Sequence, residues 1–167
     1  MVNYLNLIDV ETKGPRNDVT PLFADYKAFS ALVKDLLKGF ADAQFDAIAG
    51  IDALGFILGS AMAMRAHKGF IPIRKGGKLP VEADRVDFVD YTGETKSLEL
   101  RVNAIHKGQR VLVVDEWVET GAQVSAAIRL IEGQGGIVVG IAAIAIDDNA
   151  QTARLRKQYR CWSVWQD

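Results

Sequence analysis

Short apolar runs alternate along the chain with segments in which apolar residues recur every three or four positions. The short runs are typical of strands buried on both faces, and they fall at residues 45–50, 70–73, 111–114 and 137–146. The segments between them predict helices over residues 26–40, from about 55 to 66, and from 124 onward. Because strands and helices alternate, the pattern predicts an α/β fold with a mostly parallel twisted sheet flanked by helices.

One stretch organises the rest of the chain. The predicted strand Val111–Val114 ends at two adjacent acids, Asp115 and Glu116, and a short turn then leads into a helix. The turn consists of Glu119, Thr120, Gly121, Ala122 and Gln123. Backbone N–H groups at a helix N-terminus suit a phosphate, and carboxylates at a strand's carboxyl end can accept hydrogen bonds from sugar hydroxyls or hold Mg²⁺. The stretch is compatible with a phosphorylated sugar, but also with an ordinary strand–turn–helix carrying two solvated acids.

Two further turns follow predicted strands. Asp52, Ala53 and Leu54 lie in a glycine-containing turn between the strand at 45–50 and the next helix. The strand at 70–73 is followed by a cationic loop with two glycines and Arg74, Lys75 and Lys78. Either turn could be a solvated surface loop; their position at strand ends favours anion binding for the cationic one.

The remaining segments show weaker patterns. Residues 1–20 predict an irregular arm, after which Asp25 can cap a helix. Residues 79–98 contain many acids and turn formers, which indicates a long loop of the kind that forms lids. Residues 98–102 predict a strand, 152–159 a basic helix or turn, and 161–165 a final edge strand whose tryptophans serve packing or dimer contacts.

Composition narrows the class of protein. The 167 residues carry a net charge of −1, with 25% charged and 49% hydrophobic residues, as expected of one soluble globular domain spanning 1–167. There is no basic excess to predict nucleic-acid binding, and no apolar run long enough for a membrane span. Cys161 is the single cysteine and no signal peptide is evident, so we expect a cytoplasmic protein.

The stretch VLVVDEWVETGAQ resembles the phosphoribosyl pyrophosphate signature of the type I phosphoribosyltransferases. DAIAGIDALGFILG, FIPIRKGGKLP and NDVTPLFADYKAF are similar in order and spacing to the adenine phosphoribosyltransferases within that family. The resemblance covers nearly the whole chain from about Pro15 onward, and four ordered segments are far more specific than one short motif.

This resemblance implies a homodimeric, Mg²⁺-dependent enzyme that joins ribose 5-phosphate from phosphoribosyl pyrophosphate to adenine, giving AMP and pyrophosphate. It implies a small hood over the sheet's carboxyl edge, contributed by the N-terminal arm and residues 79–98. Asp115 and Glu116 would hold the ribose hydroxyls, and they are the candidate ligands of an Mg²⁺ that is held through the substrate. The implied phosphate and pyrophosphate sites comprise Thr120, Gly121, Ala122 and Gln123 for the 5-phosphate, and Asp52, Ala53, Leu54, Arg74, Lys75 and Lys78 for the pyrophosphate.

Two carboxyls are candidates for the acid/base. Asp90 and Tyr91 resemble a Glu-Tyr pair in the family's hood, where the acid acts near N7 of the base. Glu119 occupies the loop position at which hypoxanthine-type relatives have an aspartate. The chain departs from the adenine enzymes at Leu54, where they commonly have arginine, and in its loop, where they usually read Ala-Thr-Gly-Gly-Thr. Transfer to another purine base, or a non-catalytic sensor of the donor or of purines, therefore stays open.

Overall fold

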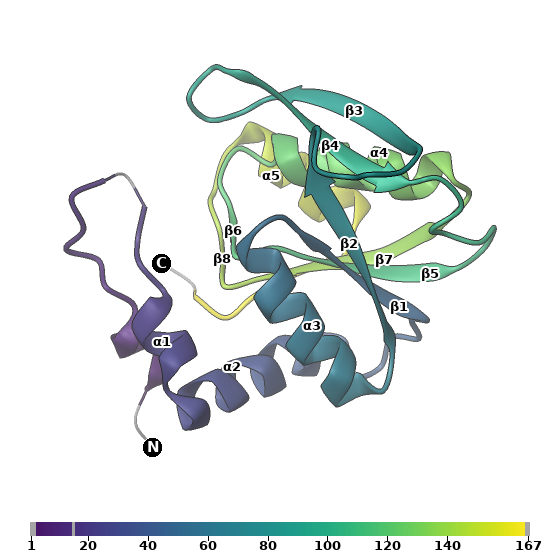
Figure 1. Ribbon diagram of the computed structural model, residues 1–167. Helices are drawn as coiled ribbons and strands as arrows, with labels where there is room; N and C mark the ends of the chain where they lie inside the picture. The colour runs from purple at the N-terminus through teal and green to yellow at the C-terminus, as the bar shows by residue number, and fades with distance from the viewer. Residues whose placement is uncertain (1–2, 15, 166–167) are drawn as a thin grey trace.

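A seven-stranded sheet runs through the molecule, as the ribbon of the computed structural model shows (Figure 1). The structure describes residues 3–14 and 16–165. The strand order is β3-β4-β2-β1-β5-β7-β9. The strands are β1 (Ala47–Ile51), β2 (Gly69–Lys75), β3 (Ala83–Val89), β4 (Thr95–Arg101), β5 (Arg110–Val114), β7 (Ile137–Ala143) and β9 (Cys161–Ser163). From β2 to β9 all neighbours are parallel, so the predicted mostly parallel sheet is confirmed.

The central strands are buried on both faces, which explains their continuous apolar runs. Val111 to Val114 of β5 have no exposed surface, and β1 and β7 pair with this strand on either side. Beyond β5 and β7 the short strands β6 (Trp117–Val118) and β8 (Ala145–Ile146) form a separate parallel pair. The strand β6 carries the chain from the acids at the end of β5 to the turn before the next helix.

Helices cover both faces of the sheet. The helical segments are η1 (Tyr4–Leu7), α1 (Thr20–Ala24), α2 (Tyr26–Lys38), α3 (Leu54–Ala66), α4 (Ala122–Gly133) and α5 (Ala150–Gln158). Apolar residues of α2 and α3 pack in one core cluster with Leu112 and Val114, and those of α4 pack in the other with Val111 and Val113. Asp25 caps α2 as predicted, accepting a hydrogen bond from the Ala28 N–H. No helix in the described part of the chain is long and apolar enough to cross a membrane.

The prediction of a long loop over 79–98 is wrong. Strands β3 and β4 form an antiparallel hairpin there, paired from Ala83 with Arg101 to Val89 with Thr95, and the hairpin packs on α4. The strand β3 is an edge strand in which only Val86 and Phe88 pack inward between exposed residues, so its apolar alternation is too short to identify a strand among the charges. Its pairing with β4 and its contact with α4 determine its conformation. Likewise Arg74 and Lys75 belong to the end of β2 rather than to a loop.

Candidate functional site

A cavity of about 390 Å³ opens at the carboxyl ends of β1, β2 and β5. It is lined by the turn after β1, the end of β2, the β3–β4 hairpin, the end of β5 with the following loop and the start of α4, the segment after β8, and the N-terminal arm, which is the described chain before α1. The predicted site residues that line it are Asp52, Ala53, Leu54, Lys75, Asp90, Tyr91, Asp115, Glu116, Glu119, Thr120, Gly121 and Gln123. The structure therefore brings together most of the residues singled out from the sequence.

The loop before α4 has the geometry of an anion site. Gly121 adopts the left-handed conformation, with φ of 80°, and immediately precedes the first residue of α4. Thr120 Oγ1 accepts a hydrogen bond from the Ala122 N–H at 3.3 Å, which stabilises the turn. Because the first N–H groups of a helix lack partners within the helix, the start of α4 can donate to a phosphate.

The two acids at the end of β5 lie in a largely dry environment. Asp115 is 6% exposed, and burial raises its pKa to about 7. Its carboxylate accepts hydrogen bonds from the Glu116 N–H (2.8 Å) and from the Gln123 side-chain amide (2.9 Å). Burial also raises the pKa of Glu116 to about 7. Both acids can therefore bind hydroxyl groups, and both gain from a nearby cation, which favours their ionised forms.

The turn after β1 and the end of β2 form a second flank of the cavity. The peptide bond between Asp52 and Ala53 is cis, and Leu54 begins α3. Arg74 does not line the cavity: its Nε donates to Asp52 Oδ2 at 3.1 Å, and its guanidinium lies 5.9 Å from the centre of the Phe56 ring. Lys75 lines the cavity, whereas Lys78 does not. This flank therefore has one cation in the cavity wall and a second that is paired with an acid.

Asp90 lies at the tip of the hairpin and all its contacts hold the turn. Its Oδ1 accepts hydrogen bonds from the Thr92 N–H (2.8 Å), the Thr92 hydroxyl (2.6 Å) and the Glu94 N–H (3.2 Å), while its Oδ2 pairs with Lys96. The hydrogen bond from Lys96 is the main reason that the pKa of Asp90 lies well below its usual range. Asp90 is therefore held as an ionised, fully engaged carboxylate.

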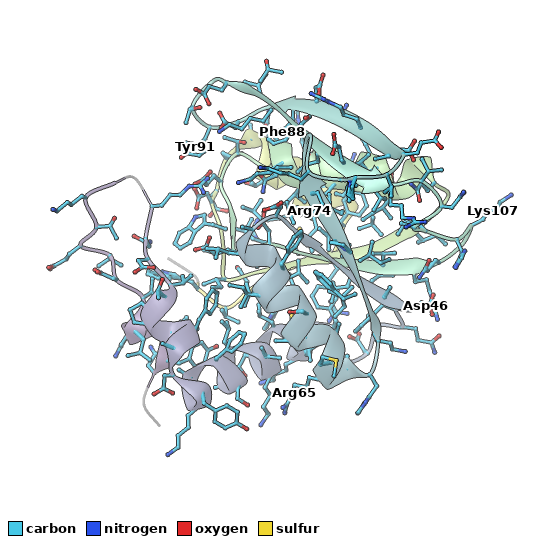
Figure 2. The ribbon with its side chains drawn as sticks, viewed as in Figure 1. Asp46, Arg65, Arg74, Phe88, Tyr91 and Lys107 are labelled. Atoms are coloured by element: carbon cyan, nitrogen blue, oxygen red, sulfur yellow. The ribbon has the colours of Figure 1, made fainter. Side chains whose placement is uncertain are left out.

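Glu119 lies in the loop before α4 and contacts the arm. Its two carboxylate oxygens face Arg16, at 3.3 Å from Nε and 3.4 Å from Nη2. The Arg16 guanidinium also lies 4.8 Å from the centre of the Tyr91 ring. Tyr91 itself lies at the tip of the β3–β4 hairpin (Figure 2). Burial raises the pKa of Glu119, and Arg16 opposes that shift. Asn149 fixes the backbone of Glu119 by donating to its carbonyl at 2.7 Å.

Several residues of the cavity were missed from the sequence. They include Arg16, Asn17, Lys96, Trp117 and Asp147, while the predicted Arg74, Lys78 and Ala122 do not line it. Trp117 directly follows the acid pair, and its indole N–H donates to Asp147 at 2.7 Å. Its position next to the acids is the feature of the sequence that could have identified Trp117 as a cavity residue. No feature of the sequence identifies Arg16, because the arm has no periodicity and the contact of Arg16 with Glu119 spans 103 positions.

Comparison with known proteins gives consistent results. The family model of the phosphoribosyl transferase domain matches residues 23–166. An adenine phosphoribosyltransferase of Cereibacter sphaeroides is 46% identical over 127 residues, which are 76% of this chain and 71% of that protein. The structure of adenine phosphoribosyltransferase from Thermoanaerobacter pseudethanolicus is similar with a TM-score of 0.88 and 34% identity, covering 96% of each chain. An APRTase from Giardia lamblia, complexed with 9-deazaadenine, has a TM-score of 0.85 at 26% identity, covering 96% of this chain and 94% of that one.

Proposed function

Because this chain belongs to the phosphoribosyl transferase domain family, we propose that it transfers ribose 5-phosphate from phosphoribosyl pyrophosphate to adenine, releasing AMP and pyrophosphate. The observation that carries the proposal is that one cavity contains the acid pair, buried Asp115 and half-buried Glu116, next to the left-handed turn at Gly121. A 5-phosphoribosyl group needs both features, a phosphate site and hydroxyl acceptors, within the length of one sugar. The relatives named above add adenine as the base.

The roles follow from the positions of the groups. The N–H groups of residues 120–123 hold the 5-phosphate, and Asp115 and Glu116 accept hydrogen bonds from the ribose hydroxyls. The turn at 52–54 and Lys75 take the pyrophosphate, with Arg74 and Lys78 acting from outside the cavity wall. In the reaction the bond from the anomeric carbon to pyrophosphate breaks, the bond from that carbon to a base nitrogen forms, and the base gives up one proton. The protein contributes mainly placement and electrostatic stabilisation.

Asp90 and Glu119 are the two candidates for the carboxyl that accepts this proton, and we assign the role to Glu119. Asp90 has its oxygens occupied by Thr92, Glu94 and Lys96, and its lowered pKa makes it a poor proton acceptor. Glu119 has a raised pKa, lines the cavity and has a side chain that is 25% exposed, with Arg16 facing its carboxylate. A carboxyl with a raised pKa accepts a proton more readily at neutral pH.

Magnesium fits the donor set. Mg²⁺ prefers carboxylate and phosphate oxygens and keeps several waters, so a donor–metal complex suits a site with two carboxylates. Among the described residues no group of three or more His, Cys, Asp or Glu is arranged as a metal site. Asp115 and Glu116 would hold it, directly or through water, and the bound ion would neutralise charge on the leaving pyrophosphate.

We also propose a homodimer in the cytoplasm. The helix α3 is apolar around most of its circumference, and its outer side exposes 41% of Ile57 and 78% of Met64. Exposed apolar residues on one helix are typical of a surface that binds another protein, and a second copy of this chain is the simplest such partner. The single Cys161 supports a reducing compartment.

A transfer assay tests the proposal. Purified protein is incubated with phosphoribosyl pyrophosphate, Mg²⁺ and radiolabelled adenine, and the formation of AMP is followed. Turnover with adenine that exceeds turnover with hypoxanthine, guanine and xanthine supports the proposal. Transfer to another purine instead, or donor binding without any transfer, would contradict it; the second outcome indicates a sensor.

A further inference from the structure

Three parts of the chain that are distant in sequence meet at Arg16. The arm supplies Arg16, the hairpin supplies Tyr91 beneath its guanidinium, and the loop before α4 supplies Glu119. The arm is itself anchored: Asp9 and Asp18 form a two-bond antiparallel bridge, and the Thr12 hydroxyl donates to the Arg16 carbonyl at 2.6 Å. The backbone of Arg16 is thus anchored within the arm, and its exposed side chain contacts Glu119 and Tyr91 at the edge of the cavity.

The proposed reaction determines which side of the cavity receives the base. A base that displaces pyrophosphate from the anomeric carbon approaches from the side opposite to the leaving group. The turn at 52–54 and Lys75 follow β1 and β2, which lie on one side of β5 in the sheet. Glu119 follows β6, whose partner β8 continues from β7 on the other side of β5, next to the arm. The base therefore lies on the flank of Arg16 and Glu119, where the tip of the β3–β4 hairpin brings Tyr91 against Arg16.

We propose that Arg16 is a positioning residue that holds the Glu119 carboxylate against the base. The inference rests on the proposed transferase function. Arg16 presents one edge of its guanidinium to both oxygens of Glu119, a two-point contact that fixes the plane of the carboxylate as well as its location. Tyr91 packs on the face of the same guanidinium and restricts its rotation.

Charge gives Arg16 a second effect on Glu119. Burial, Asp147 from the segment after β8, and Asp90 from the hairpin all raise the pKa of Glu119, while Arg16 lowers it. Glu116 also gains a higher pKa from Glu119, so negative groups surround this carboxyl. Removal of Arg16 therefore raises the pKa of Glu119 further, and a larger share of the enzyme has Glu119 protonated near neutral pH.

The test compares Arg16→Met with Lys13→Met. Both changes replace an exposed cation of the arm by methionine, but Lys13 does not line the cavity. We expect Arg16→Met to lower kcat/KM for adenine about tenfold and to shift the acid limb of its pH profile to higher pH. Lys13→Met should stay within about twofold of the wild type, and Arg16→Lys should recover part of the loss because it restores the charge without the two-point contact.

A double-mutant cycle with Glu119→Gln separates positioning from general support of the arm. If Arg16 acts through Glu119, Arg16→Met has less than about a twofold effect in the Glu119→Gln background. The inference would be overturned if Arg16→Met lowered kcat/KM as much in the Glu119→Gln background as in the wild type, or if Arg16→Met and Lys13→Met had the same kcat/KM. The AMP affinities of the same four proteins are measured by calorimetric titration. If the wild type does not turn over adenine, the proposed function fails. The AMP affinities then decide the inference separately: non-additive effects of the two substitutions show that Arg16 acts through Glu119, and additive effects show that it does not.

Discussion

Replacement of Gly121 by alanine tests whether the turn before α4 depends on the left-handed conformation. A residue with a Cβ pays roughly 1–2 kcal/mol in that region, and Gly121 has φ of 80°. The added Cβ would also lie 2.9 Å from Leu155 Cδ1, the end of a flexible side chain that can move by a few tenths of an ångström. The conformational cost therefore dominates, and we expect the free energy of unfolding to fall by about 2 kcal/mol.

Gly133→Ala is the matched control at the other end of the same helix. A Cβ there meets nothing within 4 Å, and alanine is a better helix former than glycine by roughly 0.5–1 kcal/mol, so the free energy of unfolding should stay constant or rise slightly. Both substitutions reduce the freedom of the unfolded chain similarly, so the comparison isolates the folded state.

Urea denaturation of both variants and calorimetric titration with AMP measure the two effects. We expect Gly121→Ala to be less stable than Gly133→Ala by about 2–3 kcal/mol and to bind AMP more weakly, because its N–H groups no longer point at the phosphate. Equal stability of the two variants, or wild-type AMP affinity in Gly121→Ala, would refute the reasoning.

Three further predictions concern side chains of the cavity. Glu119→Gln should lower kcat about a hundredfold and Asp90→Asn less than about tenfold, because only the first has a raised pKa; equal losses in steady-state assays would count against the assignment. Leu54→Arg should lower the KM for phosphoribosyl pyrophosphate about tenfold, and Leu54→Lys should do less, since arginine can donate two parallel hydrogen bonds; an unchanged KM would show that pyrophosphate lies elsewhere. Asp115 has a pKa of about 7 in the folded protein against 3.8 as its ordinary value, so the folded state binds the extra proton and stability falls as pH rises through this window. In ligand-free, metal-free protein the free energy of unfolding of the wild type minus that of Asp115→Asn should fall from pH 4 to 7, by up to about 1.4 kcal/mol per pH unit, and a flat difference would contradict the burial effect.

The predictable parts of the fold are those in which local pattern and final burial agree. The run Val111–Val114 becomes β5, fully buried, and the helical spacing over 26–40 becomes α2 with Asp25 as its cap. The basic segment at 152–159 overlaps α5, which ends at Gln158, and 161–165 contains the edge strand β9. In each case the residues that define the pattern also make the tertiary contacts, so the sequence carries the information locally.

The parts that were missed depend on contacts between distant segments. The strand β3 has a charged sequence and is a strand because β4 pairs with it and α4 packs on it. The motif predicted the loop from Glu119 to Gln123 as a phosphate site, but it did not show that Gln123 donates to Asp115 or that Glu119 pairs with Arg16. These hydrogen bonds join chain segments that only the complete fold places side by side.

The most direct test of the central claim is a crystal structure of this protein with AMP bound. The account predicts that the phosphate accepts hydrogen bonds from the N–H groups of residues 120–123, and that the ribose hydroxyls contact Asp115 and Glu116. A phosphate bound away from this loop, or a cavity that stays empty at saturating AMP, would contradict it.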